Sequence, residues 1–162
     1  MTRVYVGIGS NIEREKNIDG GLAALESHYG AIDISPVYEA RSVGFEGDDF
    51  FNLVAAFDTS KDVDEVEKEL RQIEYVHGRS RNETRFSSRT LDIDLLLYNG
   101  LVSKKHKIPR EDITKYAFVI KPLFDLAPDL VHPETGQSIA EIWNTFEFNQ
   151  EELKQIEYKP VQ

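Results

Sequence analysis

The sequence predicts an α+β fold in which helices cover both faces of one mixed or antiparallel sheet. Segments with the apolar composition of strands recur along the chain, at residues 3–9, 31–40, 50–58 and 91–98. Segments with helical spacing of apolar residues separate them, at residues 18–29 and 61–77. Strands and helices interleaved in this way fit a ferredoxin-like core, an α-β-α sandwich.

The composition of the chain limits the class of protein, the number of domains and the kinds of partner that we expect. A chain of 162 residues with 40% hydrophobic and 30% charged residues is typical of one globular domain, which we place at residues 1–162. The absence of cysteine excludes disulfides and thiolate-bound metals. A net charge of −10 argues against nucleic acid as a partner. Without a signal-peptide pattern or an apolar run of about 20 residues, we expect a cytoplasmic monomer that does not bind membranes.

The first strand, residues 3–9, leads into a helix through the turn Gly9-Ser10-Asn11, which offers a polar cap. This helix should end at Gly30, although Gly20-Gly21 weakens its helical propensity. A second helix, residues 61–77, should be capped by Thr59 or Ser60.

The strand expected at residues 31–40 is interrupted at Pro36, and residues 41–49 have the composition of a mobile loop. The strand at residues 50–58 contains Asn52, whose amide needs partners if it is buried. Either local backbone groups or a ligand could supply them.

The remainder of the chain predicts smaller elements. Asn99-Gly100 indicates a turn, residues 101–109 a polar edge strand, and residues 116–130 short helical pieces bounded by prolines. Ser138 begins a capping box and a helix, and residues 156–158 form a last strand.

The segment from Arg79 to Tyr98 holds the chemistry. Its first part has four arginines in eleven residues, and its second part begins with Asp92 and Asp94. On a strand these two carboxylates share one face, with Cα atoms about 6.6 Å apart. Paired carboxylates favour hard cations such as two Mg²⁺ ions, and arginines bind phosphate oxygens. Together they predict phosphoryl transfer, whereas separately each is more often a surface loop or a chance pair of acids.

These residues resemble a family signature, R-x-R-x-x-x-R-F-x-x-R-T-L-D-I-D, that of 6-hydroxymethyl-7,8-dihydropterin pyrophosphokinase (HPPK). The resemblance extends from residue 3 to about residue 133. It includes Gly9-Ser10-Asn11, Phe50-Phe51-Asn52 and the apolar, proline-containing stretch at residues 118–128.

The resemblance implies transfer of pyrophosphate from ATP to the hydroxymethyl group of the pterin, with AMP as the second product. It implies that Asp92 and Asp94 bind two Mg²⁺ ions. ATP would be held by Glu74, Arg79, Arg81, Arg85 and Arg89, with Arg110 as a further positive charge. The pterin would lie beside Gly9, Ser10 and Asn11, with its edge bound by Asn52, its faces stacked on Phe50 and Phe118, and Phe86 covering the pocket.

The chain also departs from the family pattern. Phe86-Ser87-Ser88 stands where many members have Trp-Gly-Pro, and Arg110-Glu111 where well-known members have His-Tyr. Tyr116 replaces an arginine. These changes keep two alternatives open: a diverged enzyme that acts on another pterin or alcohol, and a non-enzymatic ferredoxin-like ligand-binding module.

Overall fold

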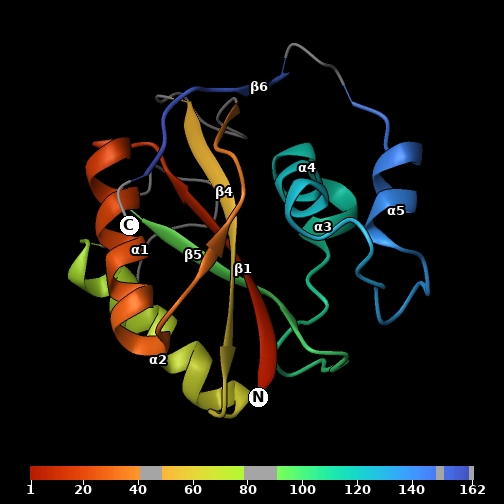
Figure 1. Cartoon of the computed structure of the whole chain (residues 1–162), viewed down its shortest axis with the longest axis horizontal. Coiled ribbons are helices and arrows are strands. Elements are labelled where there is room, and N and C mark those ends of the chain that lie inside the picture. The colour runs from red at the N-terminus through yellow and green to blue at the C-terminus, as the bar shows by residue number, and fades with distance from the viewer. Residues whose placement is uncertain (41–48, 79–90, 149–151, 161–162) are drawn as a thin grey trace.

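The computed structural model describes residues 1–40, 49–78, 91–148 and 152–160, and Figure 1 shows their arrangement. The elements in chain order are β1 (Thr2–Ser10), α1 (Arg14–Tyr29), β2 (Asp33–Ile34), β3 (Tyr38–Ala40), β4 (Phe50–Thr59), α2 (Val63–Val76), β5 (Asp92–Tyr98), α3 (Asp112–Lys115), α4 (Ala117–Leu126), α5 (Ile139–Thr145) and β6 (Leu153–Gln155).

The sheet has the order β5-β1-β4-β3-β6, with β2 paired to β4 beside β3, and every pairing is antiparallel. The fold is therefore α+β with an antiparallel sheet, as the sequence predicts. Strand β1 is an interior strand that pairs with β4 on one side and with the edge strand β5 on the other. Its position places the residues of both neighbouring strands within reach of one pocket.

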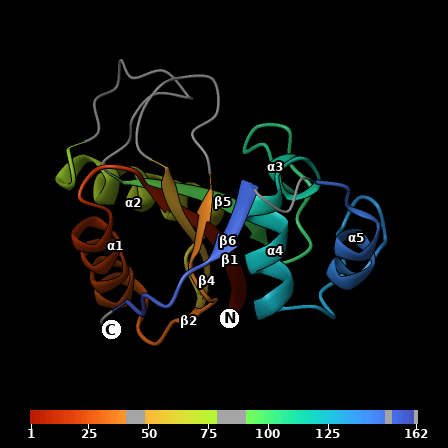
Figure 2. The ribbon, with the colours of Figure 1, turned by 90° about the horizontal axis from the view of Figure 1, so that it is seen from above.

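Helices cover both faces of the sheet. Helices α1 and α2 pack on one face around a core that contains Val4, Val6 and Ile8 of β1. Helices α4 and α5 pack on the other face, against Tyr5 and Val54 among others. Figure 2 shows the sheet edge-on between these two groups of helices. Within the described residues, no helix is long and apolar enough to span a bilayer.

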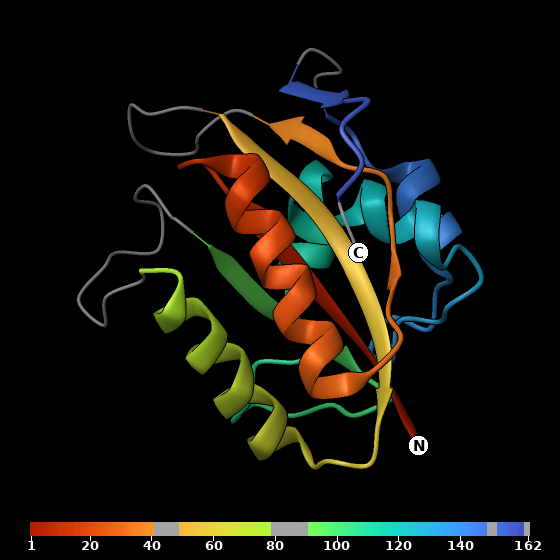
Figure 3. The same cartoon turned by 60° about the vertical axis from the view of Figure 1, so that its left-hand side comes forward.

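The two glycines inside α1 have a packing role. A Cβ added at Gly20 would lie 2.5 Å from the His77 Nε2 atom, and one added at Gly21 would lie 3.0 Å from Leu91. Gly20 thus accommodates the end of α2, which runs beside α1 in Figure 3, and Gly21 accommodates the residue that precedes β5. Close packing explains why α1 contains residues that its own helical propensity disfavours.

Several local predictions need correction. Helix α1 begins at Arg14 after Glu13, with no side-chain cap, and Ser10 still belongs to β1. Helix α2 is capped by Asp62, whose side chain accepts a hydrogen bond from the Glu65 amide; the competing candidate Thr59 ends β4. The expected α1 stop at Gly30, with φ of 80°, and the capping box at Ser138 are confirmed.

The C-terminal half of the chain differs more from the predicted elements. Pro122 lies inside α4 rather than bounding it, although it cannot donate a hydrogen bond to the carbonyl one turn earlier. The expected edge strand at residues 101–109 is absent from the described sheet. Ser103 and Ile108 form only an isolated bridge. The last strand is β6, three residues earlier than predicted, where it pairs with β3.

Candidate active site

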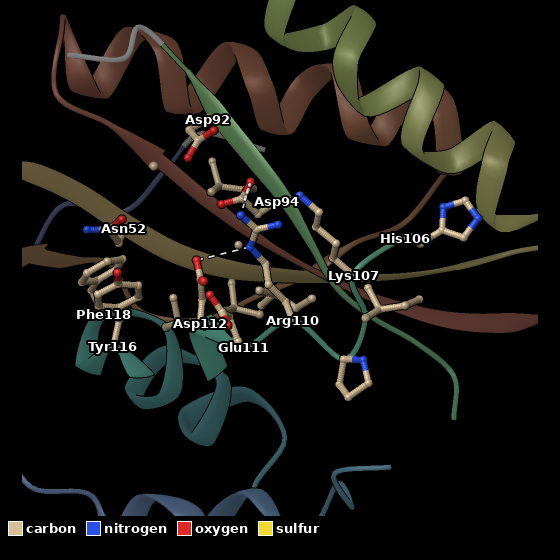
Figure 4. A pocket seen from close by; sticks show the side chains of 18 of the residues that line it. Asn52, Asp92, Asp94, His106, Lys107, Arg110, Glu111, Asp112, Tyr116 and Phe118 are labelled. Atoms are coloured by element: carbon tan, nitrogen blue, oxygen red, sulfur yellow. Dashed lines mark hydrogen bonds and ion pairs between the residues drawn. The ribbon is translucent and has the colours of Figure 1, made fainter. Parts of the chain in front are cut away.

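A pocket of about 910 Å³ opens on the sheet face that carries α3 and α4. The floor is formed by β1, β4 and β5, and the walls by residues 102–112 and the start of α4. Figure 4 shows that a charged group and an aromatic group of side chains occupy different parts of it.

Strand register builds the floor. Gly9 of β1 pairs with Asn52 on one side and with Asp92 on the other, and Gly7 pairs with Asp94. Because cross-strand partners point to the same face of a sheet, Asn52 and the two aspartates face the same side. The glycines between them carry no side chain, which leaves room there for a ligand.

The acidic pair has the predicted alternation. Leu91, Ile93 and Leu95 enter the core on the other face of the sheet, whereas Asp92 and Asp94 line the pocket. Burial and the nearby Asp92 carboxylate raise the pKa of Asp94 to about 7. An acid that is costly to ionise alone is one that a bound cation would stabilise.

Arg110 partly offsets this charge. Its Nη2 atom lies 3.5 Å from Asp94 Oδ1, and its Nε atom donates a hydrogen bond of 3.2 Å to Asp112 Oδ2. Burial lowers the pKa of the guanidinium, but Asp94 and Asp112 outweigh that effect and the net pKa is raised. Arg110 was expected to bind ATP, and the structure places it beside the acidic pair in the pocket.

A second arginine, which the sequence analysis did not identify, reaches the pocket from α2. Arg71 Nη1 lies 2.5 Å from Glu74 Oε1 and its side chain remains 49% exposed. The other oxygen of Glu74 accepts a hydrogen bond from the Ile93 amide, between the two aspartates. The Glu74 side chain is only 1% exposed, so in this arrangement it orients Arg71 and β5. A direct contact between Glu74 and ATP stays a prediction.

The side-chain amide of Asn52 has a hydrogen-bond donor that no described residue uses. It is 8% exposed, and its Nδ2 atom is buried with no hydrogen-bond partner among the described residues. A buried amide donor without a partner is costly, which favours an acceptor on a ligand over the local-backbone alternative. Gly9 leaves room for this amide, because a Cβ at Gly9 would lie 2.9 Å from Asn52 Oδ1 and one of the two would have to shift.

Aromatic rings lie next to Asn52. Phe118, at the start of α4, stacks on Tyr116 with ring centroids 4.9 Å apart, and both line the pocket with Phe50. A flat heterocycle could therefore be held by ring faces and by the Asn52 amide at once. Of the other predicted pterin residues, Gly9 lines the pocket, whereas Ser10 and Asn11 are buried beside it.

The wall at residues 103–108 is basic. Its lysines at 104, 105 and 107 line the pocket, although their pattern had predicted an edge strand. His106 fixes this segment to α2, with Nδ1 3.0 Å from Glu67 Oε2 and Nε2 3.1 Å from Asp64 Oδ1. A positive wall in a chain of net charge −10 indicates an anionic ligand.

Five predicted site residues lie outside the part of the chain that the structure describes. They are Arg79, Arg81, Arg85, Phe86 and Arg89, and their roles stay predictions.

Two pocket residues that the sequence analysis did not identify, Arg71 and Asp112, could have been found from the sequence. Arg71 lies one turn before Glu74, and Asp112 lies two residues after Arg110, both at short range from an opposite charge.

The carboxylates fit a hard divalent cation. Asp92 and Asp94 line the pocket with carboxylate oxygens, which are the ligands that hard cations prefer, and nearby positive charges favour the ionised form of Asp94. Within the described residues, no group of three or more acidic or histidine side chains is arranged to enclose a metal. Two carboxylates would leave the remaining coordination positions to water or to a phosphate-bearing ligand.

Comparison with known proteins identifies the family to which the chain is similar. A family model described as 7,8-dihydro-6-hydroxymethylpterin-pyrophosphokinase (HPPK) matches residues 5–128. The chain is 37% identical to a 2-amino-4-hydroxy-6-hydroxymethyldihydropteridine pyrophosphokinase of Pseudomonas aeruginosa over 88% of this chain and 90% of that protein. It is 34% identical to the pyrophosphokinase of the same name from Aquifex aeolicus, over 82% and 85% of the two chains.

The fold has solved relatives. The HPPK-DHPS protein of Plasmodium falciparum, solved as a triple mutant with pteroate, superposes with a TM-score of 0.74 at 14% identity. That superposition covers 95% of this chain and 46% of the other, so this chain spans about half of the solved structure. At this identity the likeness shows the fold alone. The family match and the curated relatives show more: the chain belongs to the 6-hydroxymethyl-7,8-dihydropterin pyrophosphokinase (HPPK) family.

Proposed function

We propose that this protein transfers the pyrophosphoryl group of ATP to the hydroxymethyl oxygen of 6-hydroxymethyl-7,8-dihydropterin and releases AMP. One observation carries the proposal. Gly9 lies between Asn52 and Asp92 in the sheet, which puts a buried amide for a heterocycle and a carboxylate pair for a cation in one pocket. The names of the curated relatives, which are pyrophosphokinases of this pterin, support it.

In this proposal the pterin lies against Phe118 and Phe50, and the Asn52 amide donates a hydrogen bond to an acceptor on the edge of the ring. Stacking and the hydrogen bond together orient the ring, so that its hydroxymethyl group can point along the floor toward Asp92 and Asp94. Holding both substrates in this way reduces the entropic cost of bringing them together.

The triphosphate of ATP then lies over the acidic pair. Asp92 and Asp94 would hold two Mg²⁺ ions, which when bound neutralise phosphate charge as it develops. Arg71, Arg110 and the lysines of residues 104–107 line the same pocket. We assign Arg79, Arg81, Arg85 and Arg89 to the phosphates and Phe86 to the pterin side on the basis of the signature alone.

The reaction makes one bond and breaks one. The hydroxymethyl oxygen attacks the β-phosphorus in line, the bond from that phosphorus to the α,β-bridging oxygen breaks, and AMP leaves with that oxygen. The hydroxyl proton is lost to solvent or phosphate. The protein contributes position and charge neutralisation rather than a covalent intermediate.

We further propose that the core is ferredoxin-like and that residues 1–162 are one domain. The order of elements from β1 to β5 and the sheet order β5-β1-β4-β3 support the first proposal. A cytoplasmic monomer that acts on small molecules, without nucleic acid or membrane partners, stays a prediction from the sequence. The comparisons give no support to a diverged substrate or to a non-enzymatic binding module.

The test is an AMP-release assay with ATP, Mg²⁺ and 6-hydroxymethyl-7,8-dihydropterin, with a reaction lacking pterin as control. AMP that depends on the pterin supports the proposal, and Asp94→Ala should abolish it. Formation of ADP with the same pterin would show ordinary kinase chemistry instead. Turnover close to wild type in Asp94→Ala would contradict the metal assignment.

A further inference from the structure

Arg110 is held at two points of its side chain. Its Nε–H donates to Asp112, and its Nη2 end lies 3.5 Å from Asp94 (Figure 4). The backbone is fixed as well, because the Arg110 amide donates to the Leu96 carbonyl of β5 over 3.0 Å. Asp112 is the closer partner, and its own side chain is 9% exposed. The contact with Asp94 is too long for a strong hydrogen bond.

The two partners therefore differ in what they can do. Asp112 holds Arg110 in the pocket, whereas the contact with Asp94 is mainly electrostatic. A divalent cation bound to Asp94 would repel the Nη2 end of Arg110, because both would occupy the region next to the same carboxylate. The Asp112 hydrogen bond would still keep the guanidinium in the pocket, with its outer N–H groups available to an anion.

We infer that Arg110 is a counter-cation that stabilises Asp94 while no metal is bound, and that it changes partner from Asp94 to a nucleotide phosphate when metal and nucleotide bind. The inference rests on the proposed function, since it takes Asp94 as a metal ligand and ATP as the anion. The charge of Arg110 thereby weakens the binding of a metal ion alone and strengthens the binding of a metal ion together with nucleotide.

This exchange of partners predicts that loss of the Arg110 charge changes two affinities in opposite directions. Removing the Arg110 charge should strengthen the binding of a divalent cation alone, because a nearby positive charge is lost. The same change should weaken the binding of a metal–nucleotide complex, because a charge-assisted hydrogen bond to phosphate is lost. A residue with only a structural role would move both affinities in the same direction or neither.

The experiment measures Mn²⁺ binding to the full chain by electron paramagnetic resonance, first alone and then with α,β-methylene-ATP, which does not react. Arg110→Gln is the main variant, because glutamine can still donate to Asp112 without the charge. Arg110→Lys keeps the charge, and Lys68→Gln removes one charge from the exposed surface of α2. We choose about pH 8.5, above the pKa of Asp94, so that proton competition does not obscure the result.

We expect Arg110→Gln to bind Mn²⁺ alone about three- to tenfold more tightly than wild type and the Mn²⁺–nucleotide complex about tenfold more weakly. Lys68→Gln should bind Mn²⁺ alone as wild type does, and Arg110→Lys should lie closer to wild type than Arg110→Gln, because it keeps the positive charge. Unchanged or weaker binding of Mn²⁺ alone by Arg110→Gln would overturn the inference, even if the wild type forms AMP in the presence of pterin. Absence of that AMP would instead overturn the proposed function.

Discussion

The amide of Ile93 donates a hydrogen bond of 2.8 Å to the Glu74 carboxylate, and this bond joins the last turns of α2 to β5 between the two aspartates. The same carboxylate lies 2.5 Å from Arg71. One buried side chain thus contacts both the strand that carries the acidic pair and an arginine that lines the same pocket.

Replacing Glu74 should therefore destabilise the fold. Glu74→Ala leaves the buried Ile93 amide without its acceptor, for which we expect a loss of about 1–3 kcal/mol in the free energy of unfolding. Glu74→Gln keeps an acceptor and should cost less. Urea unfolding of both variants measures the difference, and equal losses for Ala and Gln would show that the hydrogen bond to Ile93 is not the main contribution.

Arg71 should contribute to nucleotide binding rather than to pterin binding. It lines the pocket near Asp92 and Asp94, whose charges favour its ionised form. We expect Arg71→Gln to raise KM for ATP about three- to tenfold, because a charged contact to phosphate is lost, and to leave KM for the pterin unchanged. Steady-state kinetics with each substrate varied in turn checks this. The exposed Lys68→Gln is the control, and a rise in the pterin KM alone would contradict the assignment.

Asp94 should make the stability of the metal-free protein depend on pH. Its pKa in the folded protein is about 7, above the ordinary value of 3.8, so the folded state binds this proton more tightly than the unfolded state. The contribution of Asp94 to the free energy of unfolding is therefore complete below about pH 4, and it is lost as the pH rises through about 7. Chemical unfolding between pH 4 and 8 should show a smaller decline in Asp94→Asn than in wild type.

Added Mg²⁺ should reverse part of that decline above pH 7, because the cation binds the ionised carboxylate. Equal pH profiles for wild type and Asp94→Asn would show that the raised pKa does not govern this range.

The glycine next to Asn52 offers a test of the pterin site. A Cβ at Gly9 would lie 2.9 Å from Asn52 Oδ1, so Gly9→Ala should displace the amide and weaken pterin binding at least about tenfold. Asn52→Ala should weaken it similarly. Pterin fluorescence titration measures both. Gly100→Ala is the matched control, since nothing lies within 4 Å of its added Cβ, and normal pterin binding by Gly9→Ala would argue against the assigned site.

Local sequence patterns determined much of this protein. The alternation of polar and apolar residues in β5 fixed the face on which Asp92 and Asp94 lie, because side chains of a strand alternate by geometry alone. The Ser138 capping box likewise needs only neighbouring residues and is confirmed. The signature around RTLDID indicates the family from the order of residues alone.

Only the tertiary structure decided which residues from distant parts of the chain lie next to one another. Only strand register could place Gly9 between Asn52 and Asp92, and only helix packing could explain Gly20 against His77. The lysines of residues 104–107 looked suited to an exposed edge strand, yet they line the pocket. Pairing partners and pocket walls come from residues far apart in the chain, and their choice depends on how the whole core packs rather than on the local pattern.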